Sequence, residues 1–127
     1  MDLEDRAAIT DLINLHGHYV DAGWHDRMTE LLAEDVTYDT TGLGGNVIVG
    51  LARLREAAIA MGDRNPVGHH VTNIVVTEVD GDRASAISKG IGIMADGSCG
   101  SVTYHDTLSR NDSGWRIIHR RVFKPGG

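Results

Sequence analysis

Length, composition and charge exclude several classes of protein. The chain has 127 residues, with 12 Lys and Arg against 18 Asp and Glu, so its formal net charge is −6. We expect one domain over residues 1–127 and no nucleic-acid partner, because an acidic chain has no general attraction for phosphate backbones. No apolar run approaches the roughly 20 residues that cross a bilayer, and Met1–Asp5 lacks the basic start of a signal peptide. No membrane association and a cytoplasmic location are therefore predicted.

The first half of the chain has the periodicity of helices. Apolar residues recur every three or four positions between residues 2 and 22, which predicts a first helix. A short helix is expected over 26–34, with Met28, Leu31 and Leu32 facing inward. A third helix is predicted over Leu51–Met61 and ends at Gly62. Short strands are expected at Val36–Thr40 and Val47–Val49, on either side of a glycine-rich turn.

The second half of the chain has the alternation of strands. Four long strands are predicted over 69–79, 83–95, 99–110 and 115–124, separated by Asp-Gly and Asn-Asp-Ser-Gly turns. Helices followed by an antiparallel meander define an α+β fold. We expect a cone-shaped, curved antiparallel sheet wrapped around the three N-terminal helices. Gly90 and Gly92 could relieve the crowding that such curvature causes.

Ionisable side chains lie on the otherwise apolar face of the first helix. His16 shares this face with Ile9, Ile13 and Val20, and Asp21 closes the segment before a turn. A face of this kind could form one wall of a pocket. The alternative is a half-buried helix whose His16 is hydrogen-bonded within the core.

A second candidate group lies on the strand that begins at Cys99. The more apolar parity of this strand contains Tyr104 and Asp106, and we expect it to face the helices. A carboxyl in an apolar pocket can donate a proton near neutral pH. The equally weighted alternative is a structural pair between Asp106 and Arg120 or Arg121 on the last strand.

Two adjacent histidines open the first long strand, and only one of them can point inward. His69 or His70 could act as a general base, because a neutral imidazole has a pKa near 6.5. Asp21 is the obvious carboxylate to orient it. The alternative is an exposed pair of histidines at a strand end.

The sequence favours neither a metal, nor another cofactor, nor a covalent nucleophile. His16 and His18 lie on different helix faces, and no His-Glu-x-x-His helix is present. The single Cys99 lacks an electropositive setting, and the chain has no Gly-x-Ser-x-Gly elbow. We therefore expect chemistry without a cofactor.

Three segments together resemble a known superfamily. They are "DRAAITDLINLHGHYVDAGWHDRMTELLAEDVTYD", "HHVTN" and "YHDTLSRNDSGWRI". Over nearly the whole chain they resemble the nuclear-transport-factor-two-like superfamily, and within it the SnoaL-like branch with scytalone dehydratase and the lindane dehydrochlorinase. The resemblance implies that His69 abstracts a proton from carbon while Asp21 orients it, with His70 as the one-register alternative.

This sequence also departs from the patterns of that superfamily. Where the dehydratase has a tyrosine before the helix aspartate, this chain has Val20, and its other tyrosine has only Tyr38 nearby. Steroid isomerases of this superfamily use a tyrosine in the first helix, an aspartate as base on the strand after the second helix, and an acidic aspartate on the third meander strand. This chain has His16, Thr40 and Asp106 at these positions. The acid position of those isomerases is kept, whereas their base is absent.

The resemblance and the residues together predict a cofactor-independent lyase. It would remove water or halide from a small, mostly apolar molecule, with Asp21, His69 and Asp106 as catalytic residues. The expected binding residues are His16, Tyr19, Trp24, Tyr38, Met61, His70, Tyr104 and Phe123. The alternatives are an isomerase or cyclase that uses His69 or His16 as base and Asp106 as donor, or a ligand-binding module without catalysis.

One strand also suggests self-association. Ile87, Ile91 and Ile93 share one parity, while Ala84, Ala86, Ser88 and Gly90 share the other. Both faces of this strand could therefore be covered, one by the helices and one by a partner chain. We expect a homo-oligomer, a dimer before a trimer.

Overall fold

The computed structural model describes residues 2–126 and has the α+β class that the sequence predicts. Its α-helices are α1 (Leu3–Ala22) and α2 (Leu51–Met61), and its 3-10 helices are η1 (His25–Glu30) and η2 (Gly62–Arg64). Its strands are β1 (Leu32–Gly42), β2 (Val47–Val49), β3 (Gly68–Asp80), β4 (Arg83–Ile93), β5 (Cys99–Asn111) and β6 (Gly114–Phe123).

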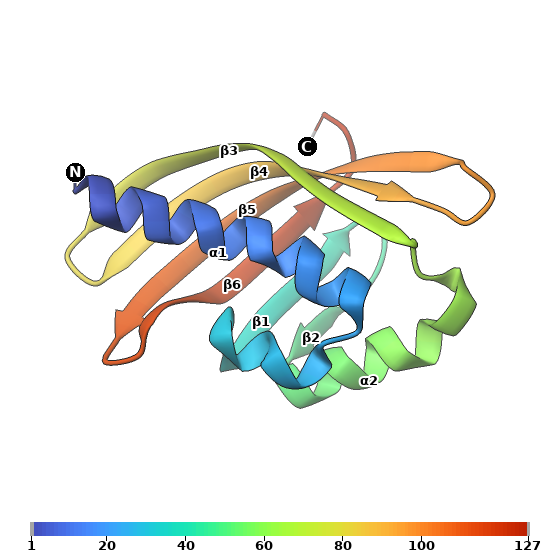
Figure 1. Cartoon of the computed structure of the whole chain (residues 1–127), viewed down its shortest axis with the longest axis horizontal. Helices are drawn as coiled ribbons and strands as arrows, with labels where there is room; N and C mark the ends of the chain where they lie inside the picture. The colour runs from blue at the N-terminus through green and yellow to red at the C-terminus, as the bar shows by residue number, and fades with distance from the viewer. Residues whose placement is uncertain (1, 127) are drawn as a thin grey trace.

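All six strands form one curved sheet that does not close. Their order is β2-β1-β6-β5-β4-β3, and the sheet curves beneath α1 (Figure 1). The strands β3 to β6 form the predicted meander, with Ala84, Ala86, Ser88 and Gly90 of β4 buried. In β3, Asn73 has a positive φ of 55° at an irregularity between Thr72 and Val75. A bulge of this kind bends a strand and increases its twist.

Two details of the expected fold are wrong. The segment expected as a helix over 26–34 ends as a 3-10 helix at Glu30, and Leu32 already begins β1. The sheet is also not purely antiparallel, because β1 runs parallel to β6, with Leu32 opposite Ile117. The backbone N–H of Ile117 donates to the carbonyl oxygen of Leu31 at 2.9 Å. Pairing with a distant strand therefore decides the conformation here, and local spacing does not reveal it.

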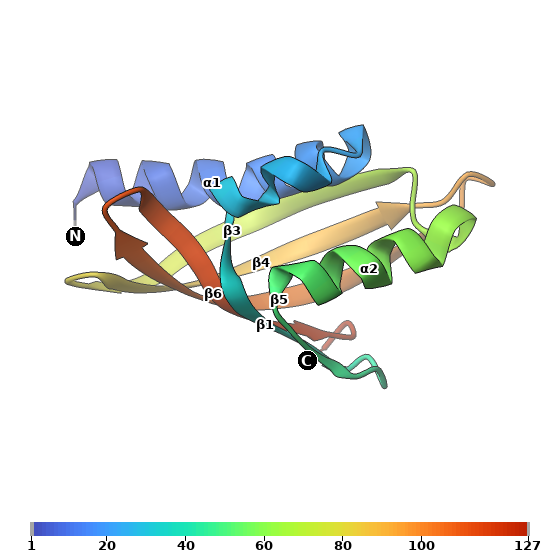
Figure 2. The ribbon, with the colours of Figure 1, turned by 90° about the horizontal axis from the view of Figure 1, so that it is seen from below.

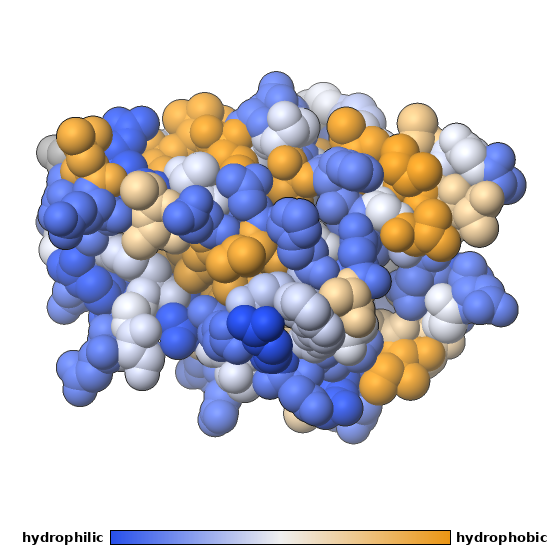
Figure 3. All heavy atoms as spheres, in the orientation of Figure 1, coloured by the Kyte–Doolittle hydropathy of each residue, from blue (hydrophilic) through white to orange (hydrophobic). Residues whose placement is uncertain are grey.

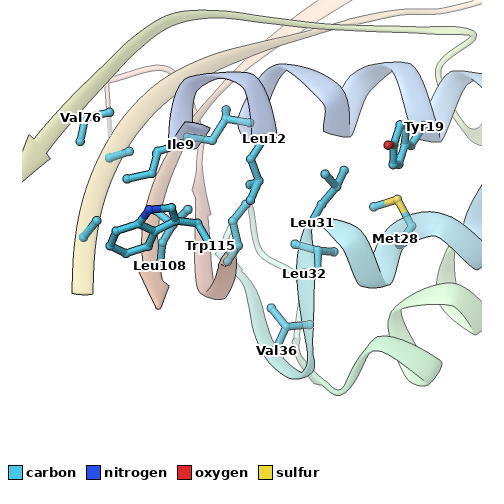
Figure 4. Packing of buried hydrophobic residues seen from close by; sticks show 14 residues of the cluster. Ile9, Leu12, Tyr19, Met28, Leu31, Leu32, Val36, Val76, Leu108 and Trp115 are labelled. Atoms are coloured by element: carbon cyan, nitrogen blue, oxygen red, sulfur yellow. The ribbon is translucent and has the colours of Figure 1, made fainter. Parts of the chain in front are cut away.

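Helix α1 lies along β3 on one side of the sheet (Figure 2). Its first turn is capped by Asp2, whose side chain accepts a hydrogen bond from the backbone N–H of Glu4 at 2.8 Å. Ile9 and Ile13 on its inner face are fully buried. Figure 4 shows Ile9 and Leu12 reaching from α1 toward Trp115 of the sheet. This packing forms the core of the molecule and fixes the helix over the strands.

Helix α2 lies at the other edge of the sheet and packs loosely. It contacts β1, β2 and η1, and none of its residues is fully buried. A single ion pair, from Arg55 Nη1 to Asp26 Oδ1 at 2.8 Å, joins it to η1. Leu51 and Leu54 of α2 pack against the core but stay partly exposed, so they can also line an opening.

The surface over α1 is mostly hydrophilic, with hydrophobic residues exposed in separate patches (Figure 3). Some of these patches lie at the end of the molecule that holds α2 and the turn between β4 and β5. Among the described residues, no helix is long and apolar enough to cross a membrane.

Candidate active site

Asp21 and His69 meet where the end of α1 crosses the start of β3. Asp21 Oδ1 lies 2.7 Å from His69 Nδ1, and the backbone N–H of His69 lies 3.0 Å from each carboxylate oxygen. A carboxylate at Nδ1 favours the tautomer that carries its proton there, which leaves the lone pair on Nε2. The structure thus joins the two side chains that the sequence pairs. Their part in catalysis stays a prediction.

The contact between Asp21 and His69 depends on the spacing of residues along α1, where side chains four positions apart lie on the same face. His16 and Val20 line the cavity described below, while Gly17 and Asp21 face His69. A Cβ atom on Gly17 would lie only 2.5 Å from the carbonyl oxygen of His69. Gly17 therefore marks a close contact between helix and strand.

Replacing Gly17 by Ala tests this close contact. In an exposed helix the change would stabilise the protein by about 1 kcal/mol. Here the methyl group meets backbone, and overpacking costs about 1–3 kcal/mol, so we expect no gain in melting temperature. We also expect a displaced contact between Asp21 and His69. Thermal unfolding measures the first effect, and a melting temperature raised by several degrees would contradict the close packing.

A two-lobed cavity lies beside the Asp21–His69 pair. One lobe has a volume of about 270 Å³ and the adjoining lobe about 410 Å³. The residues that both lobes share are His16, Tyr38, Thr40, Met61, Asn65, His69 and Tyr104. Apolar residues of α2, among them Leu51 and Leu54, line the first lobe. The glycines of β4, with Val71 and Val102, line the second.

The cavity is almost free of charged side chains. Of its described lining residues other than histidine, only Arg55 carries a charge, and Arg55 is paired with Asp26. The site is also reachable, since 23% of the His69 side chain is exposed. These features suit an uncharged molecule of moderate size.

Six of the predicted site residues line this cavity. They are His16, Tyr38, Met61, His69, His70 and Tyr104. Of the two adjacent histidines, His69 contacts Asp21 and lines both lobes. His70 is the next residue of β3, is exposed, and lines only the second lobe. Five predicted residues are not part of the lining. Asp21 is one of them, although it contacts His69, and the other four are Tyr19, Trp24, Asp106 and Phe123.

Aromatic packing elsewhere explains three of these four positions. The guanidinium of Arg27 lies 4.5 Å from the ring centroid of Tyr19 and 4.9 Å from that of Trp24. The hydroxyl of Tyr19 also donates to Glu30 Oε1 at 2.9 Å. Phe123 packs edge to face on His105, at 5.1 Å between ring centroids. These rings pack against other side chains of the fold, Tyr19 within the buried core, and none of them lines the cavity.

Asp106 forms a buried ion pair with Arg120. Its two carboxylate oxygens accept from Nε at 2.7 Å and Nη2 at 2.9 Å, and both side chains are fully buried. Burial alone would lower the pKa of Arg120, but the charge and hydrogen bonds of Asp106 raise it above its usual value. The structure thus has the pairing that the sequence left as the alternative. A carboxylate held in this way is poorly placed to donate a proton to a ligand.

His16 is an uncharged group in the cavity wall. Burial, followed by the positive charge of Arg120 and the proximity of His69, lowers the pKa of His16 well below its usual 6.5. Its imidazole can therefore donate or accept a hydrogen bond, but it carries no charge near neutral pH. Alone it would be a poor proton donor to a substrate.

The lowered pKa of His16 predicts a pH-dependent stability. The unfolded chain binds a proton at this histidine below about pH 6.5, whereas the folded protein does not. The neutral His16 therefore costs no stability above pH 6.5. Below that pH the free energy of unfolding decreases, until the pH reaches the folded-state pKa of His16. Relative to His16→Gln, the wild type should lose up to about 1.4 kcal/mol per pH unit below 6.5. Urea unfolding of both proteins from pH 7.5 to 5 measures this difference, and a constant difference would refute the buried neutral imidazole.

Comparisons with known proteins identify the family. The model of the SnoaL-like domain matches residues 1–121, so the chain belongs to the SnoaL-like family. A candidate aromatic ring hydroxylase from Novosphingobium aromaticivorans is 30% identical, with a TM-score of 0.83 over 98% of this chain and 92% of that one. The comparison with curated proteins gives no match.

Two structurally similar proteins carry names of lyases. A candidate scytalone dehydratase from N. aromaticivorans has a TM-score of 0.76 at 19% identity, covering 94% of this chain and 83% of that one. The hexachlorocyclohexane dehydrochlorinase LinA-type3 from Novosphingobium barchaimii has the same TM-score at 20% identity, with 94% and 86% covered. At these identities the similarity establishes the fold alone.

Sequence reasoning missed several residues of the cavity. Asn65 and Leu54 line it, yet neither belongs to a recognisable motif. The sequence leaves Arg120 and Arg121 as equal candidates to pair with Asp106, because the register between β5 and β6 is not visible in it. The one available signal was the pair of adjacent arginines opposite an inward-facing aspartate.

Proposed function

We propose that this protein is a cofactor-independent lyase in which His69 is the general base and Asp21 orients it. The observation that carries the proposal is the 2.7 Å contact between Asp21 Oδ1 and His69 Nδ1 at the wall of an open cavity. This contact leaves Nε2 available as a proton acceptor. A base of this kind typically contributes 100-fold or more to a rate.

The proposed reaction is an elimination. Nε2 of His69 takes a proton from a carbon atom, and the electron pair of that C–H bond forms the new carbon–carbon double bond. The group on the adjacent carbon departs with its own bonding pair, either as halide or as hydroxide, and the proton on His69 converts hydroxide to water. Asp21 stabilises the imidazolium that exists between these steps.

The substrate class follows from the lining of the cavity. Apolar residues of α2, with Val71 and Val102 of the sheet, offer surface to an apolar ring, and the lining lacks a free charge among the described residues. A charged substrate would lose its hydration without a compensating partner. We therefore propose a small, uncharged and mostly apolar substrate.

A screen of uncharged ring compounds tests this proposal. Compounds that raise the melting temperature are selected, and each is then assayed for loss of water or halide. The panel includes hydroxylated cyclic ketones and hexachlorocyclohexane. The proposal expects turnover that largely disappears in Asp21→Asn and His69→Gln. Equal turnover in the wild type and in His69→Gln would refute it.

We also propose that the protein forms a homo-oligomer through the outer face of the sheet. Val75 of β3 and Ile87 of β4, which are paired in the register, are 49% and 38% exposed on that face. Burying such residues against a second copy would remove apolar surface from water. Light scattering at micromolar concentration tests this proposal, and a monomer would refute it.

A further inference from the structure

The hydroxyl of Tyr104 is a polar group in the cavity that the proposed elimination does not yet use. Tyr104 lies on β5 opposite Ser88 and Val122, and it lines both lobes. The structure gives its hydroxyl no hydrogen-bond partner among the described residues. In contrast, the hydroxyl of Tyr19 is bonded to Glu30 and Arg27. A hydroxyl without a partner beside a cavity is available to a ligand.

Gly90 provides the space in which the ring of Tyr104 lies. A Cβ atom on Gly90 would be 2.5 Å from Cε2 and 2.8 Å from the hydroxyl oxygen, so the ring lies across bare backbone. The next residue of β4 on the same face is Gly92, which pairs with His69. Tyr104 pairs with Ser88, but its ring leans along β4 to Gly90, two residues further on. This is the direction of Gly92, the residue that pairs with His69.

Arg120 of β6 lies over the same ring. Its guanidinium carbon lies 4.1 Å from the ring centroid of Tyr104, and Asp106 holds the guanidinium in place. The buried ion pair therefore gives the ring of Tyr104 a neighbour that is itself held in place. Because the ring has close neighbours on both β4 and β6, little conformational entropy is lost when the hydroxyl binds a ligand.

We propose that Tyr104 donates a hydrogen bond to an oxygen of the substrate and stabilises the negative charge that develops there. This inference rests on the proposed function. When His69 removes a proton from the carbon next to a carbonyl, the C–H electron pair moves into the bond toward the carbonyl carbon. The carbonyl π pair moves onto the oxygen, which accepts the hydrogen bond from Tyr104 while the tyrosine keeps its proton. When the carbonyl re-forms, the former C–H pair becomes the new carbon–carbon double bond, and the leaving group departs from the adjacent carbon with its own bonding pair.

The protonation state of Tyr104 agrees with a donor that keeps its proton. Burial, with a smaller contribution from the nearby Tyr38, raises the pKa of Tyr104 to about 12. The hydroxyl therefore stays protonated across the neutral range and up to strongly alkaline pH. An oxygen acceptor suits such a donor better than a halogen does, so the inference favours an oxygen-bearing substrate such as a ketone.

Binding of acetophenone, an uncharged aromatic ketone, to the folded protein tests this inference. The probe presents a carbonyl oxygen on a flat ring and has no leaving group on the neighbouring carbon, so it can bind without being consumed. We expect Tyr104→Phe to raise its dissociation constant by about tenfold or more. Gly90→Ala should weaken binding similarly, since the new methyl group displaces the ring although the hydroxyl is retained. The matched control is Tyr19→Phe, which loses a hydroxyl outside the cavity and should bind as the wild type does.

The outcomes separate this inference from the proposed function. If the wild type and Tyr104→Phe bind the probe equally, or if the wild type does not bind it, Tyr104 is not the donor. His69→Gln should keep most of the affinity for the probe while losing turnover. Undiminished turnover in His69→Gln would refute the proposed function whatever Tyr104→Phe does. Circular dichroism checks that each variant is folded.

Discussion

Replacing His69 by Gln is expected to lower kcat/KM by at least about 100-fold while the protein stays folded. Gln can still donate a hydrogen bond toward Asp21, but it offers no basic nitrogen to the cavity. A general base typically contributes 100- to 10,000-fold. The expected effect therefore falls on turnover rather than on stability, and steady-state kinetics with the substrate found by the screen measure it.

His70→Gln is the matched control for this change. It alters the same residue type one position further along β3, where the side chain is exposed and has no contact with Asp21 among the described hydrogen bonds. His70 lines the second lobe, so its replacement can change substrate binding and KM. We expect kcat to stay within about threefold of the wild type, since His70 contributes no proton transfer. A larger loss of turnover in His70→Gln than in His69→Gln would identify His70 as the general base.

Removing one partner of the buried ion pair should have the largest effect on stability. Asp106→Ala leaves the fully buried guanidinium of Arg120 without its carboxylate. Breaking a buried pair in this way costs about 3–5 kcal/mol, which is a large share of the 5–15 kcal/mol that stabilises a typical domain. Urea unfolding followed by circular dichroism measures the loss.

The double variant Asp106→Leu with Arg120→Met separates charge burial from packing. It removes both charges and keeps apolar volume, and such replacements are often neutral or stabilising. We expect it to be at least about 2 kcal/mol more stable than Asp106→Ala, for the same reason. If Asp106→Ala unfolds at the same urea concentration as the wild type, the ion pair does not contribute as the geometry implies.

The Asp21–His69 contact could be inferred from the sequence because its parts carry recognisable signals. Asp21 follows an amphipathic helix, and His69 opens a long alternating strand, so both positions were visible. Their proximity came from the family resemblance, since 48 residues separate them along the chain. Gly17 is also visible in the sequence. Glycine destabilises a helix interior, so its presence there indicates a position where a larger side chain does not fit.

The positions that the sequence could not provide depend on pairing between distant strands. Leu32 looked like the end of a helix because its partner Ile117 lies far along the chain. Phe123 and Trp24 were expected in the cavity as large aromatic residues, but their side chains pack on His105 and Arg27. Which face an aromatic residue occupies depends on register, and a shift of one residue reverses it.

The protonation of His69 tests the central claim most directly and requires no substrate. In ¹⁵N-labelled protein, at a pH where His69 is neutral, the account predicts that its proton is on Nδ1 and that Nε2 is free. It also predicts that Asp21→Asn weakens this preference. A proton found on Nε2, or a spectrum of His69 that Asp21→Asn leaves unchanged, would contradict a base oriented by Asp21.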